Sequence, residues 1–143
     1  MIKRAESVQC AFTKKLPYMK CVTYKKRLSA LCLESLELRR LKADLIVCFK
    51  ILRGFTNIIP SEFFVWSSCS TRGHGMKLYY PDSKVTVRQN FFSVRVVQLW
   101  NKLPEEVVSA SSVRAFISRL NSMHVSFLIF CFSAVCFFNL HIF

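Results

Sequence analysis

The chain has 143 residues, a formal net charge of +13 at pH 7 and seven cysteines. This length suits one small domain, and the charge directs the chain toward anions, either nucleic acid or an acidic membrane surface. The cysteine count is odd, and the first residues are basic and interrupted rather than apolar. We therefore expect reduced thiols, with neither a disulfide framework nor a cleavable signal peptide.

The positive charge is concentrated at the front of the sequence. Residues 1–53 hold thirteen Lys and Arg against four acids, residues 54–124 hold eight against four, and residues 125–143 hold none. We divide the chain into a basic N-terminal segment (1–34), a helical region (35–124) with a loop and β insert at 55–89, and a hydrophobic tail (125–143).

The first segment, residues 6–33, is rich in cations. They are Lys14, Lys15, Lys20, Lys25, Lys26 and Arg27. Pro17 interrupts any continuous helix because proline lacks the backbone N–H and clashes with the preceding turn. The segment therefore predicts two short helices.

The second segment predicts the clearest helix. Ser35 is a candidate N-cap, and Gly54 stands just beyond the end. One face collects apolar side chains at helical spacing: Leu38, Leu41, Leu45, Cys48, Phe49 and Leu52. The rest of the helix mixes cations with Ile46, Val47 and Ile51, so we expect it to pack on two sides.

The third segment, residues 55–87, holds most of the helix breakers. It predicts a loop with short β pieces near Met76–Tyr80 and Val85–Val87. The fourth segment returns to helix from Asn90 onward. Its buried side is predicted to comprise Phe92, Val96, Leu99 and Leu103, with Pro104 ending the helix.

A shorter helix is predicted to follow, capped by Ser111 or Ser112. Its buried stripe is predicted to be Val113, Phe116, Ile117 and Leu120. The aromatic residues Phe91, Phe92 and Trp100 lie in strongly apolar surroundings, which favours core packing over stacking on bases.

A metal site is not expected. The chain has no CxxC pair, which structural zinc sites usually need. Cys69 and His74 have the spacing of the second half of a CCHC knuckle, but the other two ligand positions hold Trp66 and Tyr79. Neither is a zinc ligand in such sites.

Four stretches resemble, in order, a known family. They are "ESVQCAFTKKLP", "TYKKRLSALCLESLELRRLKADLIVCFKILRG", "TRGHGMKLYYP" and "VRQNFFSVRVVQLWNKLPEEVVSASSVRAFISRL". Together they resemble the carboxyl-terminal region of the reverse transcriptase polyprotein of non-LTR, LINE-type (jockey-like) retrotransposons, over about Glu6 to Leu120. The run RxxFFSxRVVxxWNxLPxxVVxA is the most specific part. The resemblance implies a helical, basic, thumb-like and tail portion that follows the polymerase palm and helps to hold RNA and target DNA.

The resemblance does not extend to catalysis. Polymerases of this family need paired aspartates that hold two metal ions. This chain has only Asp44, inside a predicted helix, and Asp82, after a proline in a turn. No counterpart of the family's endonuclease site is present either. We therefore expect no enzymatic activity, no catalytic residue, no metal and no cofactor.

The candidate nucleic-acid contacts are basic residues in both halves of the chain. They are Lys14, Lys15, Lys25, Lys26, Arg27, Arg72, Lys77, Arg88 and Arg95. The glycines around His74 in "TRGHGMK" would let the backbone approach a phosphate closely. A solvated basic surface and a flexible loop are the alternatives to these two interpretations.

The tail departs from the family pattern. Residues 125–143, "VSFLIFCFSAVCFFNLHIF", carry no Lys, Arg, Asp or Glu. As a helix they would span about 28 Å, close to the apolar thickness of a bilayer. The tail is either a membrane anchor, with the basic part on the cytoplasmic side, or read-through from a decayed element into unrelated DNA.

The sequence thus predicts a mainly α, small α+β fragment: the non-catalytic carboxyl-terminal portion of a retrotransposon-derived reverse transcriptase. Its expected partner is RNA or single-stranded DNA, bound weakly and without sequence preference, and no small-molecule substrate is expected. A basic, tail-anchored membrane protein and a decayed-element product without function are the alternatives. The sequence assigns no cellular location: the resemblance suggests nucleus or cytoplasm, and the tail suggests a membrane.

Overall fold

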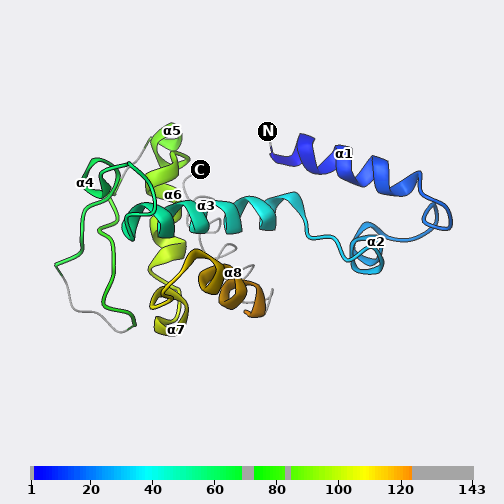
Figure 1. Ribbon diagram of the computed structural model, residues 1–143. Helices are drawn as coiled ribbons and strands as arrows, with labels where there is room; N and C mark the ends of the chain where they lie inside the picture. Colours follow the sequence, from blue (N-terminus) through cyan, green and yellow to red (C-terminus); the bar gives the residue numbers. More distant parts are fainter. Residues whose placement is uncertain (1, 69–72, 83–84, 124–143) are drawn as a thin grey trace. The chain divides into compact units, whose positions relative to one another are not determined.

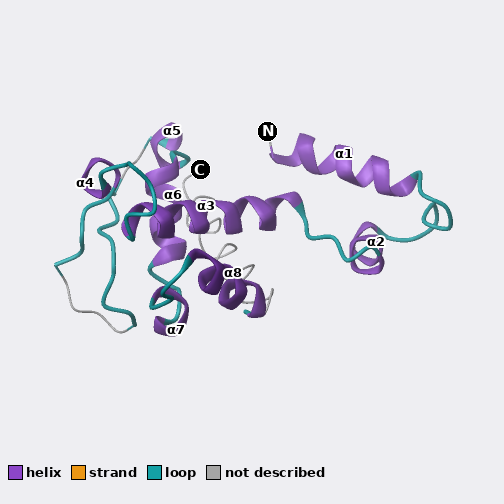
Figure 2. Cartoon of the chain, in the orientation of Figure 1, coloured by secondary structure: helices purple, strands orange, loops and turns teal. Residues whose placement is uncertain are grey.

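The computed structural model describes residues 2–68, 73–82 and 85–123, with the side chains of 2, 3 and 86 left aside. This part of the chain is mainly α, as the sequence predicts, and its ordered elements are helices joined by loops (Figures 1 and 2). The chain forms two compact units, Met1–Leu41 and Lys42–Phe143. The boundary, between Leu41 and Lys42, falls within the helix that the sequence predicts after Ser35.

Unit 1 contains the two short helices predicted for the basic segment. They are α1 (Ile2–Lys14) and α2 (Tyr24–Ala30), and Pro17 lies between them. The C-terminus of α2 is closed by two backbone hydrogen bonds, from Cys32 N to Ser29 O (3.2 Å) and from Leu33 N to Leu28 O (2.9 Å). This is a Schellman motif in which Cys32, with a φ of 51°, occupies the position that usually holds glycine.

The long helix α3 (Leu36–Leu52) has the caps that the sequence predicts. At its start, the Ser35 Oγ accepts a hydrogen bond from Leu38 N at 3.2 Å. At its end, Gly54 adopts a φ of 70° and closes a second Schellman motif. In this motif Gly54 N donates to Ile51 O and Phe55 N donates to Lys50 O. The Phe55 ring also stacks on Phe49, with 6.0 Å between centroids, which supplies the hydrophobic contact typical of this cap.

The positive φ of Gly54 leads to a prediction about stability. Gly54→Ala should lower the free energy of unfolding by about 1–2 kcal/mol, because a Cβ is strained in the left-handed region. Gly75→Ala is the matched control, since Gly75 has no positive φ and no atom within 4 Å of an added Cβ. Urea denaturation followed by circular dichroism measures both. Equal stability of the two variants would contradict the cap.

The predicted buried face of α3 is confirmed. Leu38, Leu41, Leu45, Cys48, Phe49 and Leu52 are all buried. The expectation of packing on two sides holds in part, because Ile51 is also buried while Val47 is exposed. Among the charged residues of α3, Asp44 is buried, Arg39 is exposed and the others are half-buried.

The core of unit 2 is built around aromatic rings from three helices. Phe49 of α3 stacks on Phe116 of α8 (Val113–Ser122), with 4.2 Å between ring centroids. Phe116 in turn stacks on Trp100 of α6 (Phe92–Trp100), at 6.3 Å. All three rings are fully buried, so this stack joins segments that lie far apart in the sequence.

The loop region between α3 and α6 contains less β structure than the sequence predicts. It includes the short helix α4 (Pro60–Phe63) and one antiparallel bridge, Trp66–Leu78, which falls within the predicted β piece at Met76–Tyr80. The β piece predicted at Val85–Val87 is wrong, because α5 (Thr86–Gln89) begins there. Its alternating valines resemble a strand, but Val85 and Val87 are exposed and have no neighbouring strand to pair with among the described residues.

The last three helices agree with the predictions in most respects. Helix α6 ends at Trp100. Leu103 N then donates to the carbonyl three residues back, Trp100 O, which turns the chain before Pro104. Pro104 precedes α7 (Glu105–Val108). Ser112 caps α8, since its side chain accepts from Ala115 N. Within the predicted stripe, Phe116 and Leu120 are buried, while Val113 and Ile117 are half-buried.

Three side chains fasten the loop segment 74–78 to the end of α6. His74 Nε2 lies 2.9 Å from Trp100 O, and Trp100 Nε1 donates to Met76 O at 2.8 Å. The Asn101 amide donates to Leu78 O and accepts from Leu78 N, at 2.7 and 2.9 Å. Asn101 therefore satisfies both backbone groups of Leu78, as a paired strand would.

Candidate nucleic-acid interface

Four of the predicted nucleic-acid contacts lie on the surface of unit 1. Lys14 ends α1 and Lys15 follows it, while Lys25 and Lys26 lie in the first turn of α2. All four side chains are exposed. The helices α1 and α2 are both in unit 1 and pack on each other, and the two lysine pairs stand at either end of the segment that connects them.

The acidic residues of unit 1 are less exposed than its cations. Glu6, Glu34 and Glu37 are half-buried. Glu6 accepts hydrogen bonds from the Tyr24 hydroxyl at 2.5 Å and from Leu36 N at 3.0 Å. Burial, together with the bond to Glu6, raises the pKa of Tyr24 to about 12. The exposed charges of unit 1 are thus mainly positive: Arg4, Lys14, Lys15, Lys20, Lys25, Lys26 and Arg39.

Arg27 is a correction to the predicted site. Only 4% of this residue is exposed, so it does not face solvent with Lys25 and Lys26. Its guanidinium donates to the Thr13 Oγ1 and to the carbonyl oxygens of Val22 and Cys10, and it lies over the Tyr24 ring. Arg27 holds α1 against the start of α2 and is not available for a phosphate.

The candidates in unit 2 differ in how accessible they are. Arg95 forms a bidentate ion pair with Asp44, with both N–O distances at 2.8 Å, and also donates to Asn90 O. The donors of Arg95 are thus engaged within the protein while 26% of its side chain is exposed, and a nucleic-acid contact of Arg95 stays a prediction. Lys77 is half-buried and Arg88 is exposed, while Arg72 lies outside the described residues.

His74 is buried, whereas the sequence allows a phosphate contact for the loop around it. It is 1% exposed, and its ring meets the Trp100 ring edge to face, with 5.9 Å between centroids. Because Trp100 O can only accept a hydrogen bond, Nε2 carries the proton. Nδ1 has no hydrogen-bond partner among the residues that the structure describes. A group this deeply buried cannot reach a phosphate on the protein surface.

The prediction that the aromatic residues near α6 belong to the core holds for Trp100 and is wrong for Phe91. Trp100 is fully buried, whereas Phe91 is 57% exposed. Phe92 is half-buried against Phe64, at 6.1 Å between ring centroids. Phe91 lines an open, mainly apolar groove of about 660 Å³ together with Phe63, Tyr79 and Val85, and Arg88 and Glu62 add one charge of each sign.

Four of the cysteines lie within the described residues. Cys10, Cys21, Cys32 and Cys48 are free thiols, and burial raises the pKa of Cys48 well above its usual value. Within residues 2–68, 73–82 and 85–123, no three His, Cys, Asp or Glu side chains gather as metal ligands. No helix in the same ranges is long and apolar enough to cross a bilayer. The predicted tail helix at 125–143 lies outside them.

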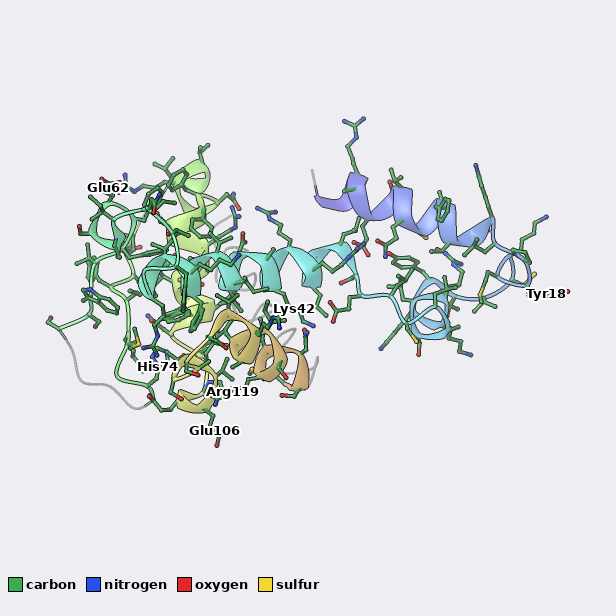
Figure 3. The ribbon with its side chains drawn as sticks, in the orientation of Figure 1. Tyr18, Lys42, Glu62, His74, Glu106 and Arg119 are labelled. Carbon is green, nitrogen blue, oxygen red and sulfur yellow. The ribbon has the colours of Figure 1, made fainter. Side chains whose placement is uncertain are left out.

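The exposed aromatic residue Tyr18 of unit 1 is not among the predicted contacts. Tyr18, in the connection between α1 and α2, is 98% exposed and has a φ of 62° (Figure 3). In the sequence, the lysines around Pro17 and Tyr18 are the only sign that this stretch could bind an anion. They do not show whether the Tyr18 ring is exposed or buried.

Comparisons with protein-family models, curated proteins and solved structures gave no match for this chain.

Proposed function

We propose that this chain is the non-catalytic carboxyl-terminal portion of a non-LTR reverse transcriptase, and that unit 1 binds RNA or single-stranded DNA without reading its sequence. The observation that carries the binding proposal is the charge of the unit 1 surface. Lys14, Lys15, Lys25 and Lys26 are exposed around one helix connection, whereas the acids of this unit are half-buried. Clustered exposed cations neutralise phosphates and displace their counterions, which requires no particular base sequence.

The positions of the two aspartates support a role without catalysis. Both carboxylate oxygens of Asp44 accept hydrogen bonds from Arg95, so Asp44 neutralises an arginine instead of facing an open site. Asp82 lies in a different segment and is exposed. A two-metal polymerase site needs carboxylates that converge on shared ions, and Asp44 is committed to another contact.

The long run that resembles the retrotransposon family is used for folding. Val96, Val97, Leu99, Trp100, Leu103, Val107, Val108 and Ala110 are buried. Arg95 pairs with Asp44, and Asn101 binds the backbone of Leu78. These roles explain why the run combines large apolar residues with an arginine and an asparagine at fixed spacings, and they leave Arg88 and Lys102 as its exposed cations.

The salt dependence of RNA binding tests the proposal. Binding of a single-stranded RNA to the whole chain should weaken linearly on a log–log plot as salt rises, by about 0.7 per phosphate contacted. We expect Lys14→Gln/Lys15→Gln to make the slope shallower by about 1.4, and Lys25→Gln/Lys26→Gln to do the same, because each pair removes two contacts. Fluorescence anisotropy at several salt concentrations measures the slopes.

A matched pair in unit 2 controls for net charge. Lys102→Gln/Arg114→Gln removes two exposed cations that are not part of the proposed surface. We expect its slope to stay close to that of the unmodified chain. If this control pair and the unit 1 pairs lower the slope equally, the chain is a general polycation and unit 1 is no binding site.

A further inference from the structure

Tyr18 combines almost complete exposure with an unusual backbone conformation. Its side chain projects from the connection between α1 and α2 (Figure 3), with 98% of the residue exposed. Burial of an aromatic ring is normally favourable, so a ring held in water is available to a partner. The φ of 62° places Tyr18 in the left-handed region, where a residue other than glycine is strained.

The turn that contains Tyr18 explains this conformation. Met19 N donates to Leu16 O at 3.2 Å, so residues 16–19 form a β-turn with Pro17 in the second position and Tyr18 in the third. Proline in the second position and a positive φ in the third are the signature of a type II turn, which normally has glycine or asparagine at the third position. Here the sequence places a large aromatic ring at that position.

The ends of this connection are fixed by the buried Arg27. Its guanidinium donates to Cys10 O and Thr13 Oγ1 in the last turns of α1, and to Val22 O just before α2. One side chain thus joins both ends of the segment that carries Tyr18. The turn that carries the Tyr18 ring is therefore held in place at both ends. Less conformational entropy is then lost when a ligand binds to the ring.

The surroundings of Tyr18 fit an anionic ligand with flat, apolar bases. Lys14, Lys15 and Lys20 are exposed in the same stretch, and no acidic residue occurs between Glu6 and Glu34. Tyr18 is the one large apolar side chain exposed in residues 15–23, because Leu16, Met19 and Val22 are half-buried. An exposed aromatic ring among lysines matches the combination that binds single strands, in which cations follow the phosphates and the ring stacks on a base. Val8 and Phe12 of α1 are exposed as well, so vesicle binding is the competing outcome to measure.

We propose that Tyr18 is a stacking platform for an unpaired base, and that unit 1 therefore prefers single-stranded to double-stranded nucleic acid. This inference rests on the proposed function, because the lysines hold the phosphates of the strand on whose base Tyr18 stacks. Stacking on an aromatic side chain accepts any base, which agrees with binding that ignores sequence. Bases inside a duplex stack on each other and do not expose a face to Tyr18.

Two substitutions in the whole chain test the inference without relying on a destabilised variant. Tyr18→Gly removes the ring and suits the positive φ, so the fold should remain as stable as before or become more stable. Tyr18→Phe keeps a ring that can stack. With a short oligouridine RNA, Tyr18→Gly should bind about tenfold more weakly, whereas Tyr18→Phe should bind like the unmodified chain.

Four further measurements separate stacking from charge and from membrane binding. The salt slope should be the same for all three proteins, since no cation has changed, and affinity for an RNA duplex of the same length should not depend on residue 18. An RNA with 2-aminopurine at one position should lose fluorescence on binding the unmodified chain or Tyr18→Phe, and lose less on binding Tyr18→Gly. Vesicles containing phosphatidylserine should bind equally to all three.

The outcomes distinguish this inference from the proposed function. If the unmodified chain shows no salt-dependent RNA binding, the proposed function fails and the inference fails with it. If binding has the expected slope but Tyr18→Gly binds oligouridine as well as the unmodified chain does, only the stacking role of Tyr18 is rejected. A loss of vesicle binding in Tyr18→Gly without a loss of RNA binding would assign the ring to a membrane surface and overturn the inference.

Discussion

Replacing Trp100 with alanine should lower the free energy of unfolding of unit 2 by about 3–5 kcal/mol, the range for removing a large aromatic side chain from a core. Trp100 is fully buried and stacks near Phe116. Its Nε1 also donates a hydrogen bond to Met76 O, and its backbone carbonyl accepts a hydrogen bond from His74 Nε2. The substitution therefore opens a cavity and removes the donor of the part-buried Met76 carbonyl, which helps to hold the loop segment 74–78.

Two other tryptophan variants show which part of this loss comes from packing. Trp100→Phe keeps most of the ring volume but leaves Met76 O without its donor, so we expect a smaller loss of about 1–3 kcal/mol. Trp66→Ala is the control, because Trp66 is 50% exposed in the same unit. Urea denaturation followed by far-ultraviolet circular dichroism measures the free energies. If Trp100→Ala is no less stable than Trp66→Ala, the aromatic stack is not the centre of the core.

The helices and their ends could be predicted because they depend on local rules. The Ser35 and Ser112 side chains each accept a hydrogen bond from the backbone N–H three residues ahead. Gly54 provides a positive φ that few other residues tolerate. The apolar face of α3 follows from the helical period alone. Each of these features is set by residues a few positions apart in the sequence. It therefore does not depend on contacts between distant segments.

The features that the sequence did not predict all depend on partners that are distant along the chain. Arg95 and Asp44 are 51 residues apart, and Asn101 and Leu78 are 23 apart. No periodicity connects such pairs, so Arg95 looked like a free cation. The error at Val85–Val87 has a similar origin, because alternating valines favour a strand only when another strand pairs with them. Exposure of Phe91 likewise depends on where the neighbouring loop runs.

Within the proposed site, the contrast between Arg27 and its neighbours shows the same limit. Lys25, Lys26 and Arg27 are consecutive cations in one turn, and composition treats them alike. The side chains of successive helical residues point about 100° apart, so one of the three faces α1 while the other two face solvent. Arginine suits the inward position because its planar guanidinium offers five donors to surrounding carbonyl oxygens. Lysine has only three donors, on a single nitrogen.

Changing Arg27 to lysine should therefore destabilise unit 1 although the charge is unchanged. The guanidinium reaches Thr13, Val22 and Cys10 at once. One ammonium cannot replace these spread donors, and a buried carbonyl oxygen left without a donor is costly. We expect the free energy of unfolding of unit 1 to fall by about 3 kcal/mol, as when a buried charge loses its hydrogen bonds. Lys26→Arg, at an exposed position, should change it by less than about 0.5 kcal/mol.

The same two variants decide whether Arg27 acts on RNA directly or through the fold. A phosphate on the protein surface is neutralised almost equally by lysine and arginine, so a direct contact predicts that Arg27→Lys keeps both stability and RNA affinity. The buried position predicts the opposite: weaker RNA binding together with a loss of the helical signal of α1 and α2, while Lys26→Arg keeps both. Urea denaturation by circular dichroism and anisotropy with oligouridine, run on the same samples, measure the two properties. If Arg27→Lys keeps both its stability and its RNA affinity, Arg27 returns to the binding surface.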